Sequence, residues 1–224
     1  MSETRRLLLF VILCLAGLFG RAQVNDAQAW LTAGVEKKLL PGLSVGLEEE
    51  VRLEENMTEV GTVYTDLSAR YRLNKRFSAA IAYRLTLKRR LDDTYARYHG
   101  WYVQGTYREK FAPVILVLRL RYQSRYAEEP ASEKASLPKN HFRTRLMVRY
   151  DTDRKFEPYL YSEAYFSTGV PAWASFDQLK LCAGVEYTFN RAHSVDLHYL
   201  VSREYNVSDP ETDFVVGIGY NFKF

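Results

Sequence analysis

The stretch TDFVVGIGYNFKF, residues 212–224, ends the chain with a regular alternation of side chains. Every second residue from Phe214 to Phe224 is apolar or aromatic, and most residues between them are small or polar. A period of two is typical of a β-strand with one apolar face. Because an exposed apolar strand edge is prone to aggregate in water, we expect this strand to be paired.

Three aromatic residues complete the apolar face of this strand: Tyr220, Phe222 and Phe224. This ending resembles the C-terminal signal of bacterial outer-membrane β-barrels. The resemblance implies that the barrel-insertion machinery takes the last strand as an added strand on its own sheet. We therefore predict that machinery as a partner, contacted through these three residues.

Residues 1–22 have the three parts of a secretory signal peptide. Arg5 and Arg6 form a positive start, residues 7–19 form an apolar run, and Gly20-Arg21-Ala22 supplies small residues at the cleavage site. The apolar run is shorter than the roughly 20 residues that a membrane-spanning helix needs. The predicted domains are a signal peptide, residues 1–22, and a β-barrel in the bacterial outer membrane, residues 23–224.

The predicted mature chain is nearly neutral. The full sequence has 31 basic and 27 acidic residues, of which three basic residues and one acidic residue leave with the signal peptide, so the net charge becomes +2. A charge this small favours no nucleic-acid partner. Cys182 is the single cysteine of the mature chain, which excludes an intramolecular disulfide and a cysteine-built metal site.

Eleven alternating runs cover the mature chain, and most of them contain 10 to 14 residues. Runs of this length suit tilted strands that cross a hydrocarbon layer about 25 Å thick, whereas soluble strands are usually about 5–6 residues long. No helical period competes with them. The sequence therefore predicts an all-β fold, a transmembrane antiparallel up-and-down β-barrel. The runs occupy residues 29–37, 43–54, 62–73, 77–88, 97–108, 113–126, 141–151, 156–168, 178–190, 193–203 and 212–224.

The sequence leaves the number of strands open between 10 and 12. Single-chain bacterial barrels have an even number of strands, which returns both termini to one side of the membrane. Eleven runs would then mean that one run is split or that the first run does not span. We expect 10–12 strands.

The polar faces of the runs carry most of the arginines. An arginine that faces lipid at the membrane centre costs roughly 2–4 kcal/mol, so we expect the charged faces to point into the lumen. A barrel of about eight strands is filled by side chains and one of 16–18 holds a channel, so 10–12 strands should be mostly plugged. An alternative is that unpaired arginines line a narrow anion path. The predicted lumenal charge network consists of Glu48, Glu50, Arg52, Asp66, Arg70, Arg72, Arg84, Arg119, Arg121, Arg143, Arg145, Glu163 and Glu186.

The two ends of the predicted barrel differ in charge. The longer connections are rich in Asp and Glu, and the short turns are rich in Lys and Arg. In bacterial barrels the long loops face outward and the short turns face the periplasm. We predict outer-membrane lipid and lipopolysaccharide as partners. One interpretation of the acidic loops is that divalent cations bridge them to lipopolysaccharide phosphates. Solvated loops are also often acidic without such a role.

Catalytic and cofactor motifs are not evident. Ser194, Asp196 and His198 share one face of a run, but residues i and i+2 of a strand are about 7 Å apart, which we interpret as too far for direct hydrogen bonds between short side chains. These three residues are therefore predicted to be lumenal polar packing. The sequence has no phosphate-binding glycine loop, EF-hand or zinc spacing, so no cofactor or metal and no enzymatic activity are expected.

Several short motifs lie along the runs between Trp30 and Phe224. They are Glu48–Glu50 with Arg52, Tyr83-Arg84, Arg119-Leu120-Arg121-Tyr122, Arg143-Thr144-Arg145, Glu163, and Arg203-Glu204-Tyr205-Asn206. In these features the chain resembles an uncharacterised outer-membrane barrel family, domain-of-unknown-function family 2490. The resemblance implies a barrel fold and an outer-membrane location, and it implies no particular activity or site.

The predicted function is structural, or the passage of small solutes and ions through a narrow and largely plugged lumen. One alternative is an outer-membrane enzyme that acts on lipid or lipopolysaccharide. A second alternative is a periplasmic β-barrel that binds a small apolar ligand. In that second case the leucine and phenylalanine faces would point inward.

Overall fold

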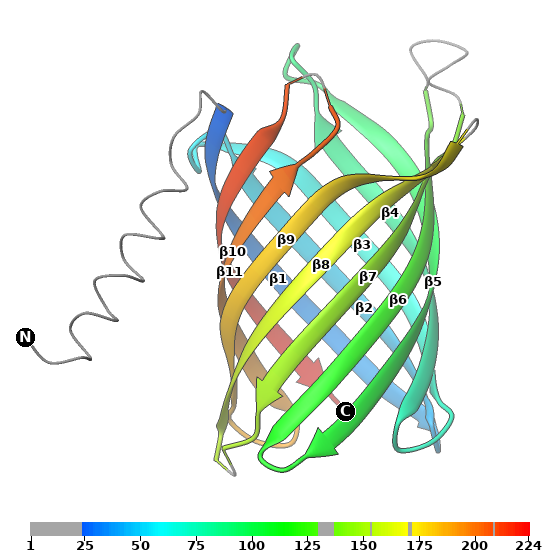
Figure 1. The fold of residues 1–224 in the computed structure, drawn as a ribbon, viewed down its shortest axis with the longest axis vertical. Helices are drawn as coiled ribbons and strands as arrows, with labels where there is room; N and C mark the ends of the chain where they lie inside the picture. The colour runs from blue at the N-terminus through cyan, green and yellow to red at the C-terminus, as the bar shows by residue number, and fades with distance from the viewer. Residues whose placement is uncertain (1–23, 130–136, 153, 170–171, 208) are drawn as a thin grey trace, which may run out of the picture.

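The computed structural model describes residues 24–129, 137–152, 154–169, 172–207 and 209–224. These residues form a single barrel of tilted β-strands (Figure 1). Among them there is no helix long and apolar enough to cross a membrane. The predicted signal peptide, residues 1–22, lies outside the described residues.

Eleven strands make up the described barrel, and each pairs with the next along the chain in an antiparallel ladder. They are β1 (Val24–Leu40), β2 (Leu43–Glu54), β3 (Glu59–Arg72), β4 (Phe77–Arg89), β5 (Tyr95–Phe111), β6 (Val114–Ala127), β7 (Lys139–Tyr150), β8 (Phe156–Gly169), β9 (Ala172–Thr188), β10 (His193–Glu204) and β11 (Glu211–Lys223). The predicted all-β barrel is confirmed. Each predicted run corresponds to one of these strands.

The barrel closes between its first and last strands, which run parallel. In this ladder Val24 lies opposite Glu211, and Glu36 lies opposite Lys223. The expectation that an odd number of runs requires a split or non-spanning run was wrong, because a parallel ladder also pairs every backbone group and leaves no open edge. One consequence is that β1 begins and β11 ends at opposite ends of the barrel (Figure 1).

The first strand is longer than its alternation predicts. It begins at Val24 rather than near residue 29, because its first residues pair with the start of β11 before β2 becomes its second neighbour. At the other end, the backbone N–H of Lys38 donates to the carbonyl of Phe224, and the N–H of Phe224 donates to the carbonyl of Glu36, both at 3.0 Å. These bonds tie the last residue of the chain to β1.

Most large apolar residues of the strands point away from the barrel interior. Leu67 and Leu160 remain about 60% exposed, at 59% and 62%, whereas Glu163 on the inner face is 0% exposed. This distribution is the reverse of that in a water-soluble domain, where large apolar residues are buried and acidic residues are not. The alternative of a periplasmic barrel that binds an apolar ligand requires leucines and phenylalanines that face inward. The outward position of most of these residues contradicts it.

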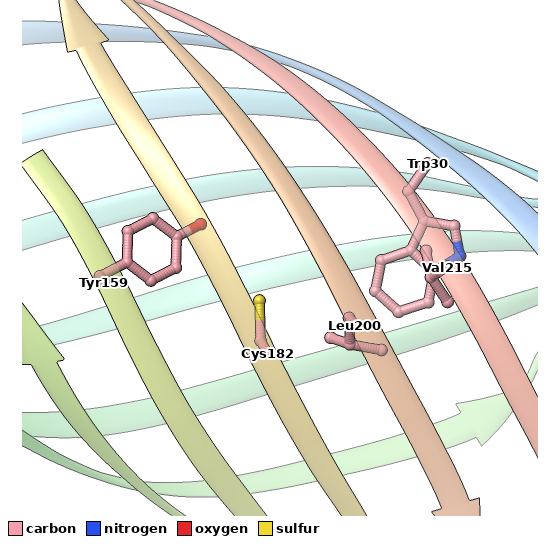
Figure 2. Close-up of a cluster of buried hydrophobic side chains, with 5 residues drawn as sticks. All are labelled: Trp30, Tyr159, Cys182, Leu200 and Val215. Carbon is pink, nitrogen blue, oxygen red and sulfur yellow. The ribbon is translucent and has the colours of Figure 1, made fainter. Parts of the chain in front are cut away.

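The interior is charged only in part. An apolar cluster of Trp30, Tyr159, Cys182, Leu200 and Val215 is buried on the inner faces of β1 and β8 to β11 (Figure 2). Each of these residues is at most 8% exposed. The predicted charged interior is thus present only in part, because one side of the lumen packs apolar side chains against one another.

Candidate functional site

The lumen contains a cavity of about 670 Å³ with a predominantly polar wall. The structure brings most of the predicted charge network to this wall. The network residues that line the cavity are Glu48, Glu50, Arg52, Asp66, Arg70, Arg84, Arg119, Arg121, Arg143, Arg145 and Glu163. Arg72 is instead exposed at the end of β3, and Glu186 pairs with Arg149 close to the end of β9.

Glu163, on β8, is the centre of the densest charge cluster. Its Oε1 atom accepts hydrogen bonds from Arg119 Nη2 at 2.6 Å and from Arg143 Nε at 3.1 Å. Its Oε2 atom accepts from Arg145 Nη2 at 2.7 Å. A fully buried carboxylate thus holds three guanidinium groups, which makes it the main counter-charge on this side of the lumen.

The register of β6 and β7 explains how the arginines gather. Arg119 lies directly opposite Arg145, and Arg121 lies directly opposite Arg143. Two Arg-x-Arg motifs on neighbouring strands therefore form a square of four like charges on the inner face. Like charges in directly opposed positions of a sheet are destabilising, so the square needs negative charge from elsewhere.

Arg121 has the least compensated charge in this square. Its Nε and Nη2 atoms both donate to Gln104 Oε1, at 3.0 and 2.6 Å, and its guanidinium lies 3.8 Å from the ring centre of Tyr102. Within the described part of the chain Arg121 forms no ion pair, although it is only 7% exposed. Arg119 also has a buried Nε atom without a hydrogen-bond partner among these residues.

The strands β2 to β4 contribute the opposite wall, where carboxylates have partners of their own. Asp66 forms a two-pronged bond with Arg84, with both N–O distances at 2.6 Å, and also accepts from Tyr102 Oη at 3.2 Å. Glu50 pairs with Arg52 at 2.6 Å. These two pairs are locally neutral.

Two further residues define this wall. The guanidinium of Arg52 is stacked 3.6 Å from the ring centre of Trp30, so the apolar cluster and the charged wall meet at that ring. Glu48 faces the cavity, and among the described residues no cation lies within ion-pair distance of its carboxylate. The wall formed by β2 to β4 therefore carries the carboxylate of Glu48 without an ion-pair partner among the described residues, and the facing wall carries the guanidinium of Arg121 without one.

Asp196 and His198 are in direct contact, contrary to the distance argument made from the sequence. His198 Nδ1 lies 2.6 Å from Asp196 Oδ1, because the two side chains lean toward each other along β10. Asp196 Oδ2 accepts from Tyr159 Oη at 2.7 Å. Within the described residues, Ser194 forms no hydrogen bond with this pair, so no Ser-His-Asp arrangement results.

Glycines on both neighbouring strands make room for this cluster, Gly217 for the His198 ring and Gly184 for the Tyr159 ring and the His198 Cβ atom. Gly184 and Gly217 lie directly opposite His198 in the two ladders. A Cβ atom at Gly217 would lie 2.1 Å from His198 Nε2, and one at Gly184 would lie 2.8 Å from His198 Cβ. His198 Nε2 is therefore packed against the barrel wall, a position that gives it little access to a substrate.

Several lining residues are absent from the predicted network, and Tyr102, Gln104 and Lys180 are three of them. Tyr102 and Gln104 lie on β5, whose two faces both carry aromatic residues, so the alternation there identifies no inner face. Lys180 lies directly opposite Glu163 and within 5.0 Å of the Trp30 ring centre. Only the strand register reveals these neighbours.

The predicted insertion residues form an outer aromatic row near the end of β11. Tyr220 Oη lies 2.6 Å from His193 Nδ1, and the Phe222 ring stacks on both His193 and Phe224. The Lys37 ammonium lies 5.2 Å from the Phe224 ring centre. The row therefore fixes the last strand against β1 and β10.

The acidic loops are partly neutralised by basic residues of the same end. Arg89 lies within 4 Å of carboxylates from Glu55, Glu59 and Asp93. The hydroxyl and backbone N–H of Thr94 hold the pKa of Asp92 below its usual range. Within the described ranges no group of three or more His, Cys, Asp and Glu residues is placed to hold a metal ion.

A closed β-barrel with an apolar outer face and a polar lumen is the architecture of outer-membrane β-barrel proteins. The chain belongs to the family described as protein of unknown function DUF2490, whose model matches residues 27–213. The family resemblance drawn from the sequence is thereby confirmed. No curated protein matches the chain.

The chain is similar to three solved structures at low sequence identity, and one of them, a secretin, has a TM-score above 0.5. A bacterial polysaccharide outer membrane secretin has a TM-score of 0.54 and 11% identity, over 79% of this chain and 63% of that chain. The β-domain of the Bordetella autotransporter BrkA has a TM-score of 0.46 and 13% identity, over 79% and 82% of the two chains. An anion-selective porin from Comamonas acidovorans has a TM-score of 0.40 and 11% identity, over 81% and 53%. The chain thus spans less than two thirds of the secretin, and the likeness shows the fold alone.

Proposed function

We propose that this protein is a bacterial outer-membrane barrel whose lumen is largely closed by charged side chains and admits only small solutes and ions. The observation that carries this proposal is the charge network on the inner wall. Its bonds reach beyond adjacent strands, since Glu163 on β8 binds Arg119 on β6, and Asp66 on β3 binds Tyr102 on β5. Side chains that bridge alternate strands occupy part of the lumen and narrow the space left for a solute.

The apolar outer surface supports a membrane location for this barrel. Leucines and aromatic residues around the barrel are exposed, and in water such a surface would be a large apolar patch. In a bilayer the same surface meets acyl chains, while each backbone group is paired within the closed sheet. Lipid and lipopolysaccharide of the outer membrane are therefore the proposed surroundings.

We propose no enzymatic role. The Asp196–His198 pair is the strongest catalytic candidate, but a hydrolase also needs a nucleophile within reach of the base. The hydroxyl of Tyr159, the other polar partner of Asp196, donates a hydrogen bond to the Asp196 carboxylate. That bond supports a role for the cluster in packing the lumen.

Single-channel recording in planar bilayers tests the lumen directly. The wild-type barrel is expected to conduct at a level roughly tenfold or more below that of an open 16-stranded porin. Replacing both Asp66 and Arg84 by alanine removes a neutral pair from the wall and should increase the conductance. The matched control is the double alanine variant of Arg97 and Glu128, an exposed pair outside the cavity. A large, steady wild-type conductance would contradict the proposal.

The barrel-insertion machinery is proposed as the partner of the last strand. Replacing Phe224 by alanine removes an exposed ring that stacks on Phe222, so insertion into vesicles that contain the purified machinery should slow severalfold. Phe111→Ala, at an exposed phenylalanine at the end of β5, is the control. Equal insertion rates for the two variants would exclude a special role for Phe224.

A further inference from the structure

The side of the cavity formed by β6 to β9 carries more positive charge than the protein neutralises. Arg119, Arg121, Arg143 and Arg145 lie on β6 and β7, and Lys180 lies on β9. The same strands also place Arg125 on the cavity wall, and Arg149, which is paired with Glu157 and Glu186. The one lining carboxylate on these strands is that of Glu163. Over the whole cavity wall the cationic residues outnumber the acidic ones by ten to seven.

The excess is buried, which makes it costly to leave uncompensated. A buried charge needs a partner charge or several hydrogen bonds to offset its loss of hydration. A guanidinium has five N–H donors, and Arg121 directs two nitrogens to one neutral oxygen of Gln104. Its remaining donors have no protein acceptor among the described residues, and Arg121 lines the cavity. The Nε atom of Arg119 also lacks a partner among these residues, but it is buried from the cavity, so only its charge acts there.

Aromatic rings hold these guanidinium groups in place. The ring centres of Tyr102, Tyr165 and Tyr161 lie 3.8, 4.2 and 4.0 Å from the guanidinium carbons of Arg121, Arg143 and Arg145, respectively. Stacking of this kind fixes the plane of a guanidinium group, so its free donors need little reordering when a ligand arrives. The arginine side chains are thus organised before any ligand binds.

The opposite wall does not offer an equivalent site for a cation. Glu50 and Asp66 are already bound to Arg52 and Arg84. Glu48 is the exception, and its carboxylate would repel an anion toward the arginines. The charge distribution across the cavity therefore has a preferred side for negative charge.

We propose that Arg119, Arg121 and Arg143 form a binding site for an oxyanion, namely the phosphate, sulfate or carboxylate group of a small solute. Guanidinium groups recognise such oxygens with paired N–H bonds, and the cavity volume of about 670 Å³ lies in the range of small-molecule sites. The inference rests on the proposed function in so far as the lumen is the route by which the solute arrives. It assigns the chemical class of that solute.

Binding of inorganic phosphate to the folded barrel in a phosphate-free detergent tests this site. In calorimetric titrations at constant ionic strength, the wild-type barrel should bind phosphate in preference to chloride. Arg121→Gln keeps a polar side chain of similar reach and removes the uncompensated charge, so phosphate affinity should fall by about tenfold or more. Arg97→Gln removes the same charge from an exposed position outside the cavity and should leave the affinity unchanged.

A second variant, Gln104→Glu, distinguishes a loss of phosphate binding from a failure of the first variant to fold. Gln104→Glu places a carboxylate where Arg121 now meets an amide oxygen, so the protein itself supplies the missing negative charge. This variant should lose phosphate binding and should melt at a higher temperature than the wild type in phosphate-free buffer. Wild-type binding no stronger for phosphate than for chloride, or full phosphate affinity in Gln104→Glu, would overturn the proposal.

The binding measurement is independent of the conductance measurement. A barrel that binds phosphate but passes no current would retain the oxyanion site and exclude solute passage. A barrel that passes small ions but shows no phosphate preference would retain the proposed function and exclude the site.

Discussion

Replacing Glu163 by glutamine is expected to destabilise the folded barrel by roughly 3–5 kcal/mol, because removing one member of a buried ionic cluster leaves uncompensated charge behind. The side chain of Glu163 is 0% exposed and accepts hydrogen bonds from Arg119, Arg143 and Arg145. Glutamine preserves the shape of the side chain but neutralises the one carboxylate that these three cations share.

Urea-induced unfolding in detergent micelles, followed by tryptophan fluorescence, measures this loss. The loss of heat-modifiable migration on gels at a lower temperature gives a second reading. Glu157→Gln is the matched control, since Glu157 is partly exposed and its partner Arg149 is also bound to Glu186. That control should lose less than about 1 kcal/mol. Similar losses for both variants would show that the cluster around Glu163 is not the main electrostatic support of the lumen.

Replacing Leu146 by arginine should cost roughly 2–4 kcal/mol, whereas the same replacement at Leu40 should cost about 0–1 kcal/mol. Both leucines are exposed, at 52% and 60%, so neither substitution creates a cavity in the barrel wall. Leu146 lies well inside β7, and Leu40 is the last residue of β1. The difference between the two therefore comes from depth in the bilayer.

Unfolding of both variants in lipid vesicles measures that difference, and heat-modifiable migration verifies that each variant has folded. If the side chains of both Leu146 and Leu40 faced water, arginine would be tolerated equally at the two positions. Equal and small losses in vesicles would therefore argue that Leu146 does not face acyl chains, and would remove the basis for a membrane location.

Together these experiments separate two properties that follow from the same inward and outward alternation. Glu163→Gln examines the enclosed charges, and Leu146→Arg examines the outer surface. A barrel could lose one property and keep the other, because the inner and outer residues of a strand have different neighbours. The pair of results would show which face dominates the stability of this protein.

Alternation along the chain was sufficient to identify the strands and their inner faces. The terminal run from Phe214 to Phe224, and runs such as that containing Leu67 and Asp66, separate apolar from polar side chains so regularly that only one orientation avoids placing arginine in lipid. The same reasoning placed Glu163 and the arginines of β6 and β7 inside the barrel. It was less effective at β5, where Trp101 and Tyr102 give both faces an aromatic character.

The sequence by itself therefore determined the strand fold, the outward position of the leucines and the inward position of most charged residues, because these depend on the period of two within each strand. Only the tertiary structure decided that β1 and β11 close the barrel in parallel, that three arginines share Glu163, and that Arg121 has an amide rather than a carboxylate as its partner. Those features depend on which strands pair and on the register between them. The pattern within one strand carries no information about that register, so the position of the uncompensated charge could be found only after the strands were paired.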